Sequence, residues 1–337
     1  MTRLFSLVEN EVFKILYKRR LTIIFCILVA LISAFSYGQK LRIQRTKDRL
    51  SKRIGASETA DWRKLADQRL IEMKNRLESP YISDNRRSET IVRMEQLKYN
   101  LENNINPIDI SSARFTTGFM EQSIFLLLPL LIIMLASDIV SGESSAGTIK
   151  LLLARSVPRW KILLSKYLAL IILEITVLLF SFVISAVVSG FFFKYGGWTA
   201  PVATGFTLMG DKLDTSGVMN IPQYEYTLMV YSLAFYVAVV VGTISFMISV
   251  LVRSTAVSIG IMMSTLIGGT FMGYFLSDWK ITRYMFMVNL RLPDYLSGSF
   301  QPIAGMNMFF SVKVLAVWTL LALSVSFIYF IREDILV

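Results

Sequence analysis

Between two long apolar stretches, residues 138–166 gather acidic, small, hydroxyl and basic side chains at short spacing. In chain order, the candidate functional side chains of this segment are Asp138, Glu143, Gly147, Thr148, Ile149, Leu152, Leu153, Arg159 and Lys166. The pattern predicts a polar exit from a membrane span, then a short helix starting near Gly147 that Pro158 breaks. Such a helix, with leucines and charges on different faces, suits docking into a groove on a cytoplasmic partner. An ordinary loop between two spans is the competing interpretation.

Enzymatic chemistry is limited by the residue types that the chain lacks. Its 337 residues contain no His and a single cysteine, Cys26. Without His, most zinc, haem and Ser-His-Asp sites are excluded. One cysteine cannot form an intrachain disulfide or a Cys-cluster metal site. An intramembrane hydrolase would need an HExxH motif or a pair of carboxylates at helical spacing within an apolar stretch, and the sequence has neither. We expect no catalytic residue, no metal site and no enzyme activity in this chain.

Glu174 is an isolated charge in the otherwise apolar run 171–177. An ionisable group at membrane depth costs about 2.5–3.5 kcal/mol on insertion scales, so it should face protein or water. One interpretation is that Glu174 lines a transport pathway or senses the conformational state. The other is a local pair with a base at the cytoplasmic end, such as Lys166 or Arg253.

Small residues recur along the apolar stretch 254–277. They are Gly260, Ser264, Gly268, Gly269 and Gly273. Small side chains on one helix face let two helix backbones approach closely. This face is expected to pack against another helix, either in a second copy of the chain or within the same bundle.

Apolar stretches long enough to cross a bilayer, about 20 residues each, occur six times. We expect spans at 21–39, 121–141, 161–193, 226–252, 254–277 and 313–331. The first has the basic flank of a signal peptide, but its end is a poor cleavage site, so an uncleaved span is expected. The predicted fold class is an all-α integral membrane protein with six transmembrane helices.

Basic residues indicate how these spans are oriented. The formal net charge is +11, and the polar insertion 38–115 alone holds 17 Lys/Arg and 11 Asp/Glu. Outside it, twelve Lys/Arg lie in termini and short loops on the side of the N-terminus, against six on the opposite side. Because short basic loops stay inside, both termini are expected in the cytoplasm of a cell-membrane protein, and the insertion outside.

Segments between the spans have their own patterns. Residues 1–20 predict a cytoplasmic amphipathic helix with Lys14, Lys18, Arg19 and Arg20 toward lipid headgroups. The other predicted segments are an extracellular helical hairpin over 40–120, a short cytoplasmic helix within 142–160, an irregular external loop over 194–225, an interfacial helix or partly membrane-inserted segment over 278–312, and a cytoplasmic tail over 332–337. Acidic residues interleave with the basic ones of the hairpin, so nucleic-acid binding is not expected.

The polar segment 138–166 resembles that of the type-2 permeases of ABC transporters, whose pattern is D-x4-E-x3-G-T-I-x2-L-L followed by R and K. The matching residues are Asp138, Glu143, Gly147, Thr148, Ile149, Leu152, Leu153, Arg159 and Lys166. The family often has Pro directly after the small/basic pair that follows the leucines, whereas here Ser156 stands there and Pro158 comes later. The six-span layout with an outer insertion is also similar.

The resemblance implies that residues 142–160 form a coupling helix seated in a cleft of a separate cytoplasmic ATPase. It implies a permease subunit of an ABC exporter, acting with a second copy or a homologous permease and with a dimer of ATPase subunits. No G-x4-G-K-[ST] phosphate loop occurs in the chain. ATP and Mg²⁺ are therefore expected on the partner, and no cofactor on this chain.

The apolar interior favours an amphiphilic substrate such as a peptide, a lipid or a hydrophobic drug. The alternative function is a non-transporting membrane sensor or scaffold whose outer domain binds a ligand. A pore-forming channel would need a polar stripe along a span, and none is evident in the sequence.

Overall fold

The protein is a multi-pass helical membrane protein. The computed structural model describes residues 2–54, 62–79, 81–82, 84–107, 110–148, 157–209, 212–275, 279–299, 303 and 305–332. Among them, five helical stretches are long and apolar enough to cross a membrane: Arg20–Thr46, Arg159–Phe193, Gln223–Leu251, Thr255–Met272 and Met308–Arg332. A bent helix pair adds a sixth if both halves belong to one span.

Helix α10 (Gln223–Leu251) is the centre of the bundle. It packs against α9 (Arg159–Phe193), α11 (Thr255–Phe275) and α13 (Met308–Arg332) as well as the bent pair. Its sequence is apolar on nearly all sides, which is the pattern of a helix surrounded by other helices. Val230, Ala234 and Val237 are among its fully buried side chains. Small residues among them let the neighbours approach closely.

The single helix predicted over 121–141 is corrected, because two helices at an angle to each other lie there instead. Helix α5 (Ser112–Ser123) and helix α6 (Leu127–Ala136) meet at an angle of 64°. Pro129 lies in the first turn of α6. Its ring would clash with the carbonyl of residue 125 in a continuous helix, and it has no N–H to donate. The bend therefore follows from a proline inside an apolar stretch that its composition alone marks as one span.

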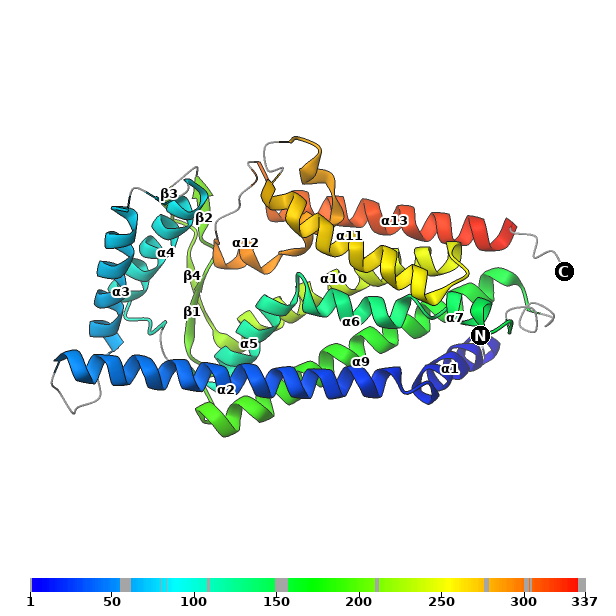
Figure 1. The fold of residues 1–337 in the computed structure, drawn as a ribbon, viewed down its shortest axis with the longest axis horizontal. Helices are drawn as coiled ribbons and strands as arrows, with labels where there is room; N and C mark the ends of the chain where they lie inside the picture. The colour runs from blue at the N-terminus through cyan, green and yellow to red at the C-terminus, as the bar shows by residue number, and fades with distance from the viewer. Residues whose placement is uncertain are drawn as a thin grey trace.

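The chain begins with α1 (Thr2–Tyr17), a turn, and the long helix α2 (Arg20–Ile54). Arg19 has a positive φ of 56° at the corner between them. Helix α2 runs beside α9 (Figure 1). It continues without a break beyond the predicted end of the first span at residue 39, because helix-forming residues follow the apolar ones.

Two further helices and four short strands lie at the end of the molecule away from α1 and α7 (Figure 1). Helix α3 (Trp62–Leu77) packs against α4 (Asp84–Glu102). Strand β1 (Pro201–Thr204) pairs with β4 (Met219–Pro222), and β2 (Thr207–Met209) with β3 (Lys212–Asp214), both antiparallel. The predicted irregular loop over 194–225 thus contains two small sheets, whose edges the Gly- and Pro-rich composition obscures.

The segment before the last span, expected to be an interfacial helix or a partly membrane-inserted segment, is divided into short helices. It contains η1 (Thr282–Tyr284), η2 (Phe286–Leu290) and α12 (Pro293–Ser297). Phe286 of η2 stacks edge-on against Trp318 of α13, with 5.8 Å between ring centroids. Pro293 starts α12, and Gly298, with a φ of 65°, ends it.

Candidate functional site

Four charged side chains close a ring where α1, α7 (Ser141–Ser145) and α9 meet. Lys14 Nζ lies 2.9 Å from Glu11 Oε1 and 2.5 Å from Glu143 Oε1. Lys166 Nζ lies 2.9 Å from Glu11 Oε2 and 2.7 Å from Glu143 Oε2. Each ammonium group thus contacts both carboxylates, and the ring has no net charge. The contact between Lys166 and Glu143 is an ion pair without hydrogen-bond geometry.

The ring is largely withdrawn from solvent. The side chain of Lys166 is 1% exposed, that of Glu143 5% and that of Glu11 9%, whereas Lys14 closes the ring at 39%. Burial alone would raise the pKa of Glu11, but Lys166 and Lys14 outweigh it and hold that pKa below its ordinary value. Burial alone would lower the pKa of Lys14, but hydrogen bonds to Glu143 and Glu11 raise it. The partners thus stabilise the charged forms.

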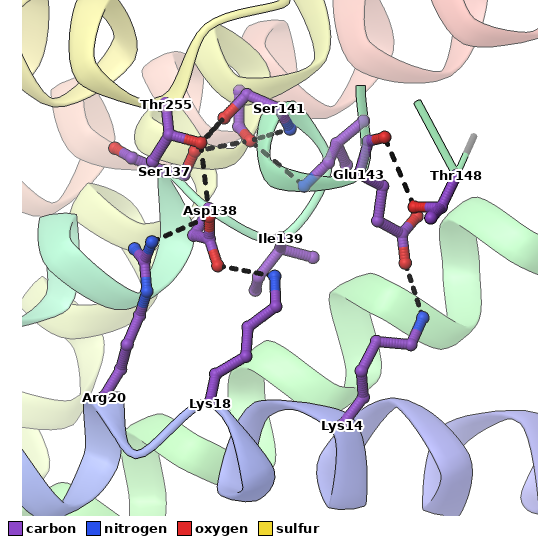
Figure 2. A network of polar contacts seen from close by, with 12 residues as sticks. Lys14, Lys18, Arg20, Ser137, Asp138, Ile139, Ser141, Glu143, Thr148 and Thr255 are labelled. Carbon is purple, nitrogen blue, oxygen red and sulfur yellow. Dashed lines mark hydrogen bonds and ion pairs between the residues drawn. The ribbon is translucent and has the colours of Figure 1, made fainter. Parts of the chain in front are cut away.

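A second ion cluster forms around Asp138, just before α7. Lys18 Nζ lies 2.9 Å from Asp138 Oδ2, and Arg20 donates toward Oδ1 at 2.9 Å (Figure 2). Thr255 at the start of α11 donates to the same Oδ1 at 3.2 Å. Asp138 therefore joins the α1–α2 corner to the α6–α7 corner and to α11.

The α6–α7 corner is held in place by Ser249 near the end of α10. Ser249 Oγ accepts from the N–H groups of Val140 and Ser141 at 3.2 and 2.9 Å, and donates to Ser137 O at 2.9 Å. These bonds satisfy backbone groups that the helix break leaves without partners. Gly142 leaves the space that the carboxylate uses, because a Cβ there would collide with Oδ1 of Asp138.

Gly147 has a defined structural role. It has a φ of 70°, and it donates its N–H to Ser144 O at 3.1 Å. Thr148 donates its N–H to Glu143 O at 3.0 Å. This pair of bonds is the Schellman motif, which needs a left-handed residue after the helix and so favours Gly. The helix expected to start at Gly147 is thus preceded by another helix, α7, which ends at Ser145 and is capped by Gly147.

The structure places the other predicted residues as follows. Arg159 begins α9 and donates to Ile331 O of α13 at 3.2 Å. Ile149, Leu152 and Leu153, on which the predicted docking face depends, lie outside the described residues. Asp138 and Glu143 lie at the same end of the bundle, but in two separate ion groups, and Lys166 belongs to the group of Glu143.

Glu174 is not paired with Lys166, which corrects the local-pair interpretation for that residue. Lys166 contacts Glu11 and Glu143, and neither oxygen of Glu174 has a hydrogen-bond partner among the described residues. Glu174 belongs to a buried polar row on one face of α9, where the sequence showed no polar stripe. The row comprises Lys166, Glu174, Ser181, Ser185 and Ser189. Successive members of this row are eight, seven, four and four residues apart, spacings that place them on one helix face.

The small residues of α11 divide between two faces. Gly260, Ser264 and Gly268 are exposed, and a Cβ on either glycine would meet no atom within 4 Å. Gly269 is buried, and a Cβ there would collide with Met287 of η2. Packing within the chain therefore explains Gly269 and not the first three. The side-chain surroundings of Gly273 lie outside the described residues.

The basic residues of the N-terminal helix were expected to face lipid headgroups, and this is corrected for three of them. Lys14, Lys18 and Arg20 point to Glu143 and Asp138 (Figure 2). Elsewhere on its surface, α1 exposes apolar side chains. These exposed residues are Phe5, Phe13, Leu16 and Tyr17. Glu11 was missed altogether. The available signal was its position three residues before Lys14, a spacing at which oppositely charged side chains meet on a helix.

The fold and this site define a multi-pass helical membrane protein with a buried ion cluster joining its N-terminal helix to the second and third spans. Comparison with known proteins gives its family. The chain belongs to DUF2705, a family of proteins of unknown function, whose model matches residues 91–336.

Two relatives come from Bacillus subtilis (strain 168). The chain is similar to the uncharacterized protein YhcI, with 28% identity over 291 residues, which cover 85% of this chain and 88% of the relative. It is also similar to the uncharacterized membrane protein YdbK, with 26% identity over 217 residues, which cover 63% of this chain and 80% of the relative.

The family match corrects the resemblance to type-2 ABC permeases. The family that covers most of the chain is DUF2705, and nothing in the comparisons assigns the chain to those permeases. The motif residues with described contacts have local reasons to be where they are. Gly147 caps a helix, and Asp138 and Glu143 neutralise buried or partly buried bases. A short pattern of this kind can satisfy local physics without defining a family.

Proposed function

We propose that this protein is the membrane-spanning subunit of an exporter driven by a separate cytoplasmic ATPase. The observation that carries the proposal is the closed ring of Glu11, Lys14, Glu143 and Lys166. It joins α1 to α7 and α9, the helices that precede and follow the chain segment 146–158. In this proposal, ATP and Mg²⁺ bind to the partner.

The ring supports the proposal through its mechanics. Separating a buried carboxylate from its only ammonium partners leaves an unpaired charge, which is strongly unfavourable. A force on segment 146–158 would therefore move α1, α7 and the start of α9 together. Because α9 is one continuous helix of 35 residues, such a movement would reach the opposite membrane surface. This is what an ATPase docked on that segment requires.

The proposed topology puts both termini in the cytoplasm and residues 40–120 outside, in a cell membrane. It is supported by the excess of basic residues in the short segments on the side of the N-terminus. Helix α1, α7 and the end of α13 also lie at one end of the molecule, and α3 and α4 at the other (Figure 1). The outward face of α1 would then rest on the inner leaflet.

Assembly with a second copy or a similar chain belongs to the same proposal. The exposed small residues Gly260, Ser264 and Gly268 of α11 are free of contacts that would hide them within the chain. They form a smooth surface that suits a close helix–helix contact in lipid. An amphiphilic substrate between two such subunits would suit the apolar interior.

The test is capture of the ATPase. The protein is purified with an affinity tag from cross-linked membranes of its own host, and its partners are identified by mass spectrometry. We expect a soluble protein with a phosphate-loop motif, recovered at the same level with the wild type, with Glu143→Gln and with Glu9→Gln, because the ring is proposed to pass movement and not to bind the ATPase. Repeated recovery without any ATPase would contradict the proposal.

A sensor or scaffold is the second candidate, and one observation favours it. Gln96 of α4 donates to the backbone carbonyls of Ser297 and Gly298 at 2.8 and 3.1 Å, next to α12. Tyr99 stacks edge-on against Phe206 beside them. A ligand that moves α3 and α4 would thus act on the membrane body. Ligand-dependent change without an ATPase partner would favour this candidate.

A further inference from the structure

Glu174 lies in the middle of α9, and among the described residues its carboxyl group has no hydrogen-bond partner. The residue is 1% exposed, and neither Oε1 nor Oε2 has a hydrogen bond from any described residue. The buried carboxylates of the ion ring, Glu11 and Glu143, both contact lysines. Unlike the acids of the ion ring, Glu174 is therefore buried without a contact to any described lysine or arginine.

The carboxyl group fits a space that α10 and α6 provide. A Cβ on Gly242 of α10 would collide with Oε1 of Glu174 and come within 3.3 Å of Ile132 of α6. The missing side chain of Gly242 thus makes room for the carboxyl group. This glycine has no left-handed backbone, so close packing is the reason for its presence here.

The titratable residues closest to Glu174 on α9 contact other residues, and α6 contributes none. On α9, Lys166 is eight residues away, about 12 Å along the helix, and it contacts Glu11 and Glu143. The hydroxyl of Tyr167 shares a hydrogen bond of 2.9 Å with Thr243 of α10. The sequence of α6 has no titratable residue.

Among the remaining neighbours of α9, helix α5 carries Glu121, which accepts a hydrogen bond from Tyr226 of α10 at 2.6 Å. In the apolar part of α2, the titratable residues are Cys26 and Tyr37, both exposed. On α13, Lys313 lies over Phe309 near the start of the helix, and Tyr329 and Arg332 are in its last turns. In α10, Tyr236 donates to Val312 O. None of the described bases is paired with Glu174.

We propose that Glu174 is a proton-binding site, neutral while α9 and α10 are packed together and ionised when they separate. An ionised carboxylate without partners in an apolar interior is strongly disfavoured, whereas a neutral carboxyl costs far less. When the interface opens, the carboxyl O–H bond breaks, the proton passes to a water molecule, and the electron pair stays on the carboxylate. Closing reverses this step. The site does not depend on the proposed transport function.

The experiment uses N,N′-dicyclohexylcarbodiimide, an apolar reagent that reacts with protonated carboxyl groups. The acid proton moves to a carbodiimide nitrogen, a carboxyl oxygen bonds to the central carbon, and rearrangement gives a stable N-acylurea. The full-length protein in detergent is treated at pH 8 and mapped by mass spectrometry. We expect Glu174 to be modified about two orders of magnitude more than Glu9, because solvent-exposed carboxyls are almost fully ionised at that pH.

Sodium and potassium chloride are added in parallel samples. Modification unaffected by either salt supports a proton site, whereas protection by one cation would show a metal-ion site and overturn the proposal. Gly242→Ala is expected to displace the carboxyl group and make its modification fall as pH rises from about 6 to 8, while the wild type stays level. A level response in a folded Gly242→Ala protein would contradict the packing argument.

Infrared spectroscopy gives a second measurement that does not depend on reagent access. Glu174→Gln keeps the size and neutral charge of the protonated side chain, so it should fold with an unchanged elution volume and melting temperature. The difference spectrum between wild type and Glu174→Gln should contain a carboxylic-acid C=O band. Carboxylate bands in its place, or a marked loss of stability in Glu174→Gln, would refute the neutral state.

Discussion

Lys166 has the least exposed ammonium group in the ion ring, and it contacts two carboxylates from different helices. Lys14 contacts the same two carboxylates from a position that is 39% exposed. Solvent screening reduces what Lys14 contributes to stability, so Lys166 should be the member on which the ring depends most.

Replacing Lys166 by Met tests this dependence. The change removes the buried ammonium and leaves Glu11 and Glu143 with Lys14 alone, so we expect a loss of about 3–5 kcal/mol in unfolding free energy. Chemical denaturation in detergent measures it. Lys161→Met, on the same helix and outside the ring, should change stability by less than about 1 kcal/mol. Equal losses of unfolding free energy with the two substitutions would show that the ring does not contribute to stability through Lys166.

Acid should weaken the ring through Glu11. The pKa of Glu11 in the folded state lies below 4.5, its ordinary value, so its contribution is complete above that pH and disappears as pH falls through the folded-state pKa. The difference in melting temperature between wild type and Glu11→Gln should be constant at about pH 6 to 8 and shrink below about pH 4.5. Glu9→Gln, exposed on α1, should show no such difference. A difference in melting temperature between wild type and Glu11→Gln that grows below about pH 4.5 would contradict the lowered pKa of Glu11.

Gly147 should resist substitution because of its backbone. At a φ of 70°, a Cβ costs about 1–2 kcal/mol, so Gly147→Ala should lower the unfolding free energy by that amount and Gly147→Asn by less. Gly118→Ala is the matched control, since Gly118 is helical and a Cβ there would meet no atom within 4 Å. Thermal unfolding in detergent makes the comparison. A tolerated Gly147→Ala would contradict the Schellman cap.

At the scale of elements, the sequence predicts the spans well and their internal geometry poorly. Runs without charge locate α10 and α11 to within a few residues, because transfer of apolar surface from water depends on composition. The bend at Pro129 and the strands near residues 201 and 219 depend on local backbone geometry, which apolar composition hides.

The candidate site shows the same division. Asp138 and Glu143 are recognisable from sequence as polar residues at the end of a span. Their partners Lys18 and Lys14 come from 120 and 129 residues earlier in the chain. With one sequence, such a pairing has no local signal, and a basic amphipathic helix is as readily explained by lipid headgroups.

Helix α11 offers a matched pair of glycines for a test at this scale. Gly269→Val should destabilise the subunit, because its side chain would enter the space of Met287. Gly268→Val, one residue away and exposed, should leave the unfolding of the isolated subunit unchanged. Cross-linking between copies is measured alongside and should fall only with Gly268→Val. Loss of stability in both variants would place both glycines inside the subunit.

In the whole molecule, helix α9 connects one end of the protein to the other. Its first turns contribute Lys166 to the ion ring, and its middle contains Glu174. Near its end, the hydroxyl of Ser189 shares a hydrogen bond of 2.9 Å with that of Ser112 of α5. A helix so connected moves as a unit, and both the ring and the α9–α10 interface depend on where it lies.

The central claim is that the ring passes movement between a cytoplasmic ATPase and the spans. The most direct measurement is the rate of ATP hydrolysis by the captured partner, with and without the membrane subunit in lipid nanodiscs. The account predicts that wild type and Glu9→Gln stimulate hydrolysis equally and that Glu143→Gln and Lys166→Met bind the ATPase but lose most of the stimulation. Full stimulation by both ring variants, in subunits shown to be folded, would contradict it.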